Sequence, residues 1–142
     1  MGSKFDATGS SIPTATLAVR GGLAAVLSVV VNGLLLGIVL TVEPVETFDA
    51  LSIPPVVGLT VLGVIGASVL YGFVTGRVDD PDRTFVIVAA VVLVLSFVPT
   101  ASLLAFDDEA VVGGVVVLSI MHVVVAAACV WALTDRYSPI AR

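Results

Sequence analysis

The stretch from residue 110 to residue 133 reads AVVGGVVVLSIMHVVVAAACVWAL and determines the fold class of this chain. It contains no Asp, Glu, Lys or Arg. About 20 consecutive apolar residues are enough for an α-helix to cross the hydrocarbon core of a bilayer, which is roughly 30 Å thick. The run is rich in valine, but an open strand in lipid would leave its backbone N–H and C=O groups without partners. The run therefore predicts a transmembrane helix.

Three further runs have the same character, and they lie at residues 21–42, 53–76 and 84–106. Residues that favour helix starts precede two of them. Ser52 is expected to cap the second run, and Asp80 is expected to cap the third, with Pro81 in its first turn. The links between the runs are short, so neighbouring helices should run antiparallel. The sequence therefore predicts an all-α fold, in which residues 1–142 form a single membrane domain, an antiparallel bundle of four transmembrane helices.

The overall composition points to the same class of protein. Hydrophobic residues make up 58% of the chain and charged residues 12%, whereas soluble domains have about 45–50% and about 25%. A soluble chain of 142 residues could not bury so much apolar surface, so lipid must cover part of it. The excess of eleven acidic over six basic residues resembles the acidic surfaces of proteins from salt-loving archaea. So few basic residues argue against nucleic acid as a partner.

The positions of the basic residues predict how the chain is oriented in the membrane. All six lie before the first run, between the second and third runs, or after the fourth run: Lys4, Arg20, Arg77, Arg83, Arg136 and Arg142. The links on the other side carry acidic residues and no basic ones. Basic segments remain on the cytoplasmic side of a membrane. We therefore expect a multi-pass protein of the plasma membrane with both its N-terminus and its C-terminus in the cytoplasm.

Three polar side chains fall near the same depth, close to the midplane of the predicted bundle: Asn32, Ser96 and His122. A polar side chain there needs a partner that lipid cannot supply. A neutral imidazole has one donor and one acceptor to satisfy, and both Asn32 and Ser96 can offer either kind of group. We therefore expect His122 to face the interior and to reach at least one of them, directly or through a water.

His122 has a functional and a structural interpretation. As a functional residue it would be a proton carrier, a pH sensor, or a ligand to a metal or haem. As a structural residue it would hydrogen-bond to another helix. A metal site needs three or four ligands, and His122 and Cys129 are the only histidine and cysteine in the chain. No metal and no cofactor are therefore expected.

Enzymatic activity is not expected either. A single cysteine cannot form an intramolecular disulfide or carry out thiol–disulfide exchange within the chain. The sequence also shows no arrangement of serine, histidine and acid that would activate a nucleophile. The four runs contain no Asp, Glu, Lys or Arg, which argues against a charge-coupled transporter.

Small residues along the runs predict where helices pack closely. Gly33 and Gly37 form a GxxxG motif, which brings helices together either within a bundle or between copies of a chain. We therefore expect Gly33 or Gly37 to face another helix at close range. Gly63 and Ala67 are expected to give the second run a packing face of the same kind. On the first run a stripe with helical spacing suits an inward face, and it consists of Gly21, Ala25, Ser28 and Asn32.

Three segments resemble an uncharacterised family of small four-helix membrane proteins found in actinobacteria and halophilic archaea. They are residues 54–58 (PPVVG), residues 85–99 (FVIVAAVVLVLSFVP) and the pair Met121-His122. The resemblance would cover all four runs. It implies the fold and no activity, and it draws attention to His122, which stands where that family has a Met-His pair.

These observations lead to two hypotheses about function. The first is a non-enzymatic bundle that acts in the lipid bilayer as a subunit, a scaffold or a homo-oligomer, with other membrane proteins or copies of itself as partners. The alternative is a channel or transporter for a small solute or protons that uses a midplane layer of Asn32 and His122. A continuous polar path from that layer to either face would distinguish the alternative, and Val and Leu dominate above and below the layer.

Overall fold

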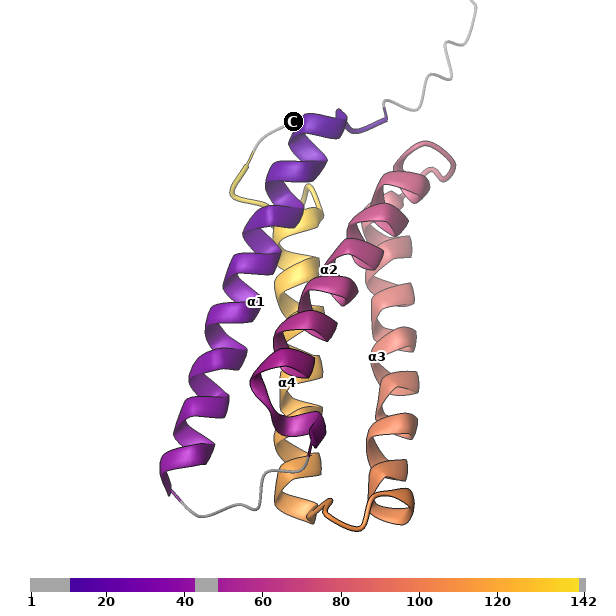
Figure 1. Ribbon diagram of the computed structural model, residues 1–142. Coiled ribbons are helices and arrows are strands. Elements are labelled where there is room, and N and C mark those ends of the chain that lie inside the picture. Colours follow the sequence, from indigo (N-terminus) through magenta and orange to yellow (C-terminus); the bar gives the residue numbers. More distant parts are fainter. Residues whose placement is uncertain (1–10, 43–48, 141–142) are drawn as a thin grey trace, which may run out of the picture.

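The computed structural model describes residues 11–42 and 49–140. Its regular elements are four long α-helices and one short 3-10 helix: α1 (Thr14–Val42), η1 (Asp49–Leu51), α2 (Ile53–Thr75), α3 (Pro81–Phe106) and α4 (Val112–Leu133). The long helices lie side by side (Figure 1). Each of the four is long and apolar enough to cross a membrane. The described part of the chain is thus all-α, as the sequence predicts.

Helices α2 and α4 each pack against the other three helices, and the contacts of α4 with α1 and α3 are the more extensive. Helices α2 and α3 meet each other more loosely than α1 and α4 do. Large apolar side chains also point outward, and Leu34, Leu62 and Val98 are 63%, 63% and 67% exposed. Water would hydrate such a surface poorly, whereas lipid tails match it.

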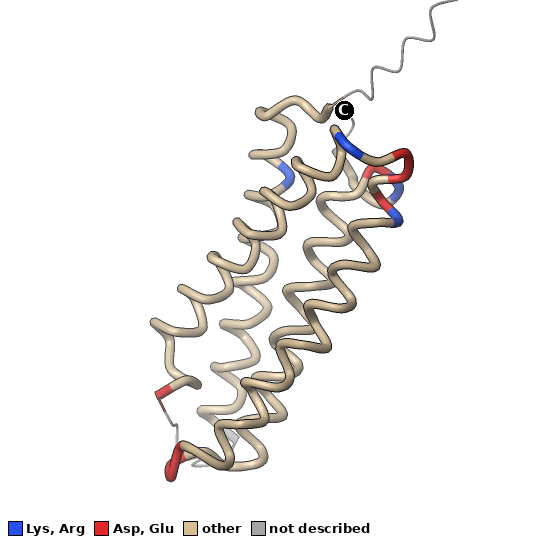
Figure 2. Tube along the Cα trace, turned by 90° about the vertical axis from the view of Figure 1, so that its right-hand side faces the viewer, with Lys and Arg blue, Asp and Glu red and all other residues tan. Residues whose placement is uncertain are grey.

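The two ends of the helices differ in charge. The end that we call the basic end contains every basic residue in the described part of the chain, and these are Arg20, Arg77, Arg83 and Arg136. Several acidic residues lie there too. The opposite end, which we call the acidic end, carries only acidic charges among the described residues: Asp49, Asp107, Asp108 and Glu109. Figure 2 shows this separation along the Cα trace.

Helix α1 begins at Thr14, whereas the sequence predicted a start at residue 21. As a result Arg20 lies inside a helix of membrane-spanning length, so the expectation that these helices contain no charged residue is wrong for α1. Helix α3 also contains charged residues, Asp82 and Arg83, but only in its first turn. The sequence predicted that Arg20 lies just before the first apolar run. In the structure its side chain is only 1% exposed, and its Nη1 lies 2.7 Å from Oδ1 of Asp135. This partner from the far end of the chain allows the helix to continue past the charge.

The same guanidinium and one carboxylate tie the basic end together. Arg20 also donates to the carbonyl of Leu133 at 3.0 Å and to the carbonyl of Ile140. Asp82, in the first turn of α3, accepts from Oη of Tyr71 on α2 at 2.7 Å. It also accepts from the backbone N–H of Arg136 at 2.9 Å. Hydrogen bonds to charged groups are stronger than neutral ones, so α1 and α3 are both fastened to the segment that follows α4.

The helix starts agree only in part with the predicted caps. Asp80 caps α3, since its carboxylate accepts from the backbone N–H of Arg83 at 3.0 Å, and Pro81 follows it. Ser52 stands at the N-cap position of α2, but its side chain makes no capping bond. Its hydroxyl donates instead to the carbonyl of Asp49 at 2.7 Å. The N-cap position of Ser52 is therefore confirmed, but its hydroxyl bonds to η1 and not to the first turn of α2.

Candidate functional site

Asn32 lies on the inward face of α1 and is 1% exposed. Its Nδ2 donates to Oγ1 of Thr60 on α2 at 3.1 Å. Its Oδ1 is buried and has no hydrogen-bond partner among the described residues. Sequence analysis overlooked Thr60, although a threonine within the second apolar run is the kind of group that a buried amide needs. Asn32 is therefore fixed between two helices but keeps one unsatisfied acceptor.

His122 hydrogen-bonds within its own helix. Its Nδ1 lies 2.7 Å from the carbonyl oxygen of Leu118, one turn earlier on α4. A carbonyl can only accept, so Nδ1 carries the hydrogen, and Nε2 of a neutral ring is then an acceptor. No hydrogen bond joins His122 to Asn32 or Ser96 within the described residues. Ser96 likewise uses its own helix, since its hydroxyl donates to the carbonyl of Leu93 at 2.7 Å.

Two cavities meet at His122. The smaller one, about 80 Å³, lies among α1, α2 and α4 and is lined by Asn32, Thr60 and His122 together with apolar side chains. The larger one, about 540 Å³, lies among α2, α3 and α4, and its polar lining residues are Ser96 and His122. His122 thus shares one cavity with Asn32 and another with Ser96. The three residues do not form one connected layer.

The described residues do not suggest a metal centre. Across 11–42 and 49–140, no three of the His, Cys, Asp and Glu side chains come close enough together to hold a metal ion. Cys129 is 3% exposed, and it borders the larger cavity two turns along α4 from His122. The chemistry that this region offers is therefore hydrogen bonding by acceptors at the edge of an apolar space.

Comparison with known proteins places the chain in a family. The sequence profile of one family matches residues 7–139, which include all four helices. The chain belongs to DUF6069, a family of unknown function. No curated protein and no solved structure matches it. The family carries no assigned activity, so the function of this DUF6069 protein has to be argued from its geometry.

The glycines of the GxxxG motif face outward in this DUF6069 protein. Gly33 and Gly37 are exposed, and a Cβ atom built on either one would meet no atom of the chain within 4 Å. The expectation of a close helix contact at these glycines is thus wrong within the described chain, and a contact between copies stays a prediction. On α2, a Cβ at Gly63 would lie 3.8 Å from Val125 of α4, and Ala67 packs against the buried core.

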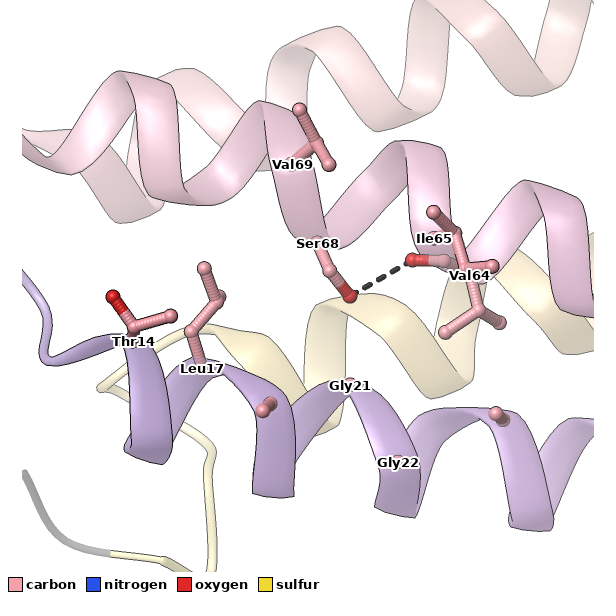
Figure 3. Close-up of a pocket in the computed structure, with 10 residues that line it drawn as sticks. Thr14, Leu17, Gly21, Gly22, Val64, Ile65, Ser68 and Val69 are labelled. Atoms are coloured by element: carbon pink, nitrogen blue, oxygen red, sulfur yellow. Dashed lines mark hydrogen bonds between the residues drawn. The ribbon is translucent and has the colours of Figure 1, made fainter.

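The close contact between α1 and α2 occurs at Gly21 instead. A third cavity of about 330 Å³ lies beside this contact. In Figure 3, Gly21 of α1 faces Ser68 of α2, whose hydroxyl donates to the carbonyl of Val64 at 2.8 Å. A Cβ on Gly21 would come within 2.6 Å of the Ser68 hydroxyl oxygen. The inward stripe that begins at Gly21 therefore marks the tight helix contact in this DUF6069 protein, and the GxxxG motif does not.

Proposed function

We propose that this DUF6069 protein is a non-enzymatic membrane subunit that associates with further copies of itself through the outer face of α1. The observation that carries the proposal is the outward position of Gly33 and Gly37. Lipid tails are as apolar as leucine, so burying apolar side chains contributes little free energy to the association of helices in a bilayer. Small residues on an outer face let a second helix approach closely enough for extensive van der Waals contact.

The residues around these glycines support a continuous contact face. Outward residues on α1 recur at spacings of three and four, so they fall on one side of the helix: Val26, Val30, Gly33, Gly37 and Leu40. The two glycines form a shallow groove between larger side chains on this face. A second copy of α1 presents the same groove and the same ridges, and a symmetric contact between copies uses one patch on both.

Replacing Gly33 and Gly37 together by leucine should therefore leave the fold intact and reduce self-association. The fold should persist because both glycines are exposed and a Cβ atom at either position would meet no described atom within 4 Å. We expect wild-type protein in detergent to contain oligomers by cross-linking and native mass spectrometry, and the double variant to shift toward the single-chain mass.

Gly58→Leu is the matched control for this experiment. Gly58 lies on α2, is exposed, and a Cβ there also meets no atom within 4 Å. It should keep the wild-type oligomer. An unchanged oligomer in the Gly33/Gly37 double variant would contradict the proposal, since the glycines would then simply face lipid.

We also propose that the four helices cross the plasma membrane as an antiparallel bundle, with the basic end and both termini in the cytoplasm. Support comes from the charge separation between the two ends and from the rule that basic segments stay inside.

A labelling experiment tests this orientation. Cys129→Ala removes the native cysteine, so that single introduced cysteines can report the orientation. Asp108→Cys, at the acidic end, should react in whole cells with a membrane-impermeant thiol reagent. Asp79→Cys, at the basic end, should react only after the membrane is permeabilised.

Labelling of Asp79→Cys but not of Asp108→Cys in intact cells would contradict the proposed orientation and indicate the opposite one. Labelling of both positions in intact cells would argue against a spanning arrangement or indicate damaged cells. A cytoplasmic marker protein with an accessible thiol, measured in the same samples, separates those two outcomes.

A channel or transporter remains the second candidate function. One observation favours it, namely the small cavity that Asn32, Thr60 and His122 share. Conduction would require polar groups from this cavity to both ends of the helices. Its other neighbours include Val56, Leu118 and Met121, all of them apolar, so this candidate ranks below self-association.

A further inference from the structure

The larger cavity is an apolar groove between α2 and α3, with α4 as its floor. Small residues on all three helices create it, among them Gly66 on α2, Ala89 on α3 and Ala126 on α4. Its volume of about 540 Å³ falls within the range of roughly 300–1,000 Å³ that is typical of small-molecule sites. Such sites are mostly apolar, with a few polar groups that orient the ligand. This groove has that character.

Two unsatisfied acceptors stand near the boundary between the groove and the smaller cavity. One is Nε2 of His122, which is an acceptor because Nδ1 donates to Leu118. The other is Oδ1 of Asn32, which is buried without a partner at the smaller cavity. His122 and Leu59 line both spaces, so the two are neighbours. Leaving the buried Oδ1 of Asn32 without a donor is costly. Nε2 belongs to the half-buried ring of His122 and accepts no hydrogen bond from the described residues. This boundary is therefore complementary to a group that donates a hydrogen bond.

We propose that the groove binds a lipophilic alcohol, an apolar molecule with a single hydroxyl group. Its apolar body lies between α2 and α3, and its hydroxyl donates to Nε2 of His122. A plain hydrocarbon chain would fill the space but would leave the imidazole acceptor unsatisfied. His122 also lines the smaller cavity, which has a volume of about 80 Å³ and so has room for a water that donates to Oδ1 of Asn32.

This site is separate from the face proposed for self-association. No residue of α1 lines the groove, whereas Gly33 and Gly37 lie on the outer side of α1. The two proposals therefore fail or succeed independently.

The test uses the purified full chain in detergent and two photoreactive probes. One is hexadecanol with a diazirine in its chain, and the other is its methyl ether, which keeps the length and the oxygen but cannot donate. Irradiation followed by peptide mass spectrometry should place the alcohol on groove-lining peptides of α2, α3 and α4. The ether should need about a fivefold higher concentration for equal labelling, as expected for the loss of one neutral hydrogen bond.

Three variants make the test specific. His122→Phe keeps a ring but removes the acceptor, so it should abolish the preference for the alcohol over the ether. Gly66→Leu places a large side chain in the groove at a position where an added Cβ meets no atom within 4 Å, and it should prevent specific labelling by both probes. Gly58→Leu, also on α2 but outside the groove, should label like wild type.

Three outcomes would overturn the proposal. They are equal labelling of the wild type by alcohol and ether, a preference that survives in His122→Phe, and labelling that Gly66→Leu leaves unchanged. The first means that His122 recognises no donor, and the third means that the probes merely partition into the detergent around the helices. Equal labelling of the wild type by both probes, and unchanged labelling of Gly66→Leu, can be measured even if His122→Phe fails to fold. Circular dichroism and gel filtration establish the folding of each variant.

Discussion

Arg20→Met should destabilise this protein more than the removal of any other described basic side chain. The variant loses the ion pair with Asp135 and the hydrogen bonds to the carbonyls of Leu133 and Ile140. Breaking a buried ion pair by truncating one partner costs on the order of 3–5 kcal/mol. Asp135 is 31% exposed at its side chain, so solvent screens part of this loss. We expect a loss of roughly 3 kcal/mol, measured as a lower melting temperature in detergent by circular dichroism or by loss of the gel-filtration peak.

Arg83→Met is the matched control. It removes one positive charge from the same end of the helices, but Arg83 is exposed, and its side chain makes no hydrogen bond or ion pair with the described residues. Its stability should stay within about 0.5 kcal/mol of wild type. Arg20→Lys should fall between the two, since an ammonium keeps the charge but cannot reproduce the planar fork of donors. Equal melting temperatures for Arg20→Met and Arg83→Met would mean that the bonds of Arg20 contribute nothing measurable.

Gly21→Leu and Gly22→Leu should differ sharply although the two residues are adjacent. At Gly21 an added Cβ lies 2.6 Å from the hydroxyl oxygen and 3.4 Å from Cβ of Ser68, so a larger side chain forces α1 and α2 apart. Overpacking of this kind typically costs about 1–3 kcal/mol. At Gly22 an added Cβ meets no atom within 4 Å. The same thermal measurement should therefore show a clear loss for Gly21→Leu only.

The comparison isolates packing because both variants replace glycine by leucine in the interior of one helix. The gain in helix propensity is the same for both. Gly21→Ala, combined with Ser68→Ala to remove the clashing hydroxyl, should recover most of the lost stability relative to Gly21→Ala alone. If Gly21→Leu were as stable as Gly22→Leu, the close approach of α1 and α2 at Ser68 would be wrong.

The four helices were predicted from the sequence, but the direction in which several residues face was not. The GxxxG motif of Gly33 and Gly37 predicted a close contact, yet both glycines face outward in the described chain, and Gly21 makes the close contact to Ser68. A GxxxG motif shows only that two residues one turn apart are small. The direction in which they face depends on how the whole helix is rotated about its axis. The inward stripe of Gly21, Ser28 and Asn32 was the better guide, because it combined small size with polar groups that need to be buried together.

The midplane residues show a related limit. Their shared depth predicted that His122 would reach Asn32 or Ser96, directly or through a water. Depth alone does not fix how each helix is rotated about its axis, and so does not decide which side chains meet directly. In the structure His122 and Ser96 donate to carbonyls of their own helices at 2.7 Å, and Thr60 is the partner that Asn32 meets. A carbonyl one turn earlier is always within reach of such side chains, whereas a partner on another helix has to be brought there by packing.

The sequence by itself determined that the chain is all-helical and has four helices of membrane-spanning length. The physical reason is local, since long apolar runs without charges can satisfy their backbone groups in lipid only as helices. Only the tertiary structure decided that α1 extends back to Thr14 with Arg20 buried inside it, because the groups that stabilise that charge lie more than 110 positions away in the sequence. It also decided that a groove lies among α2, α3 and α4, since this space depends on how the faces of three helices with small residues come together.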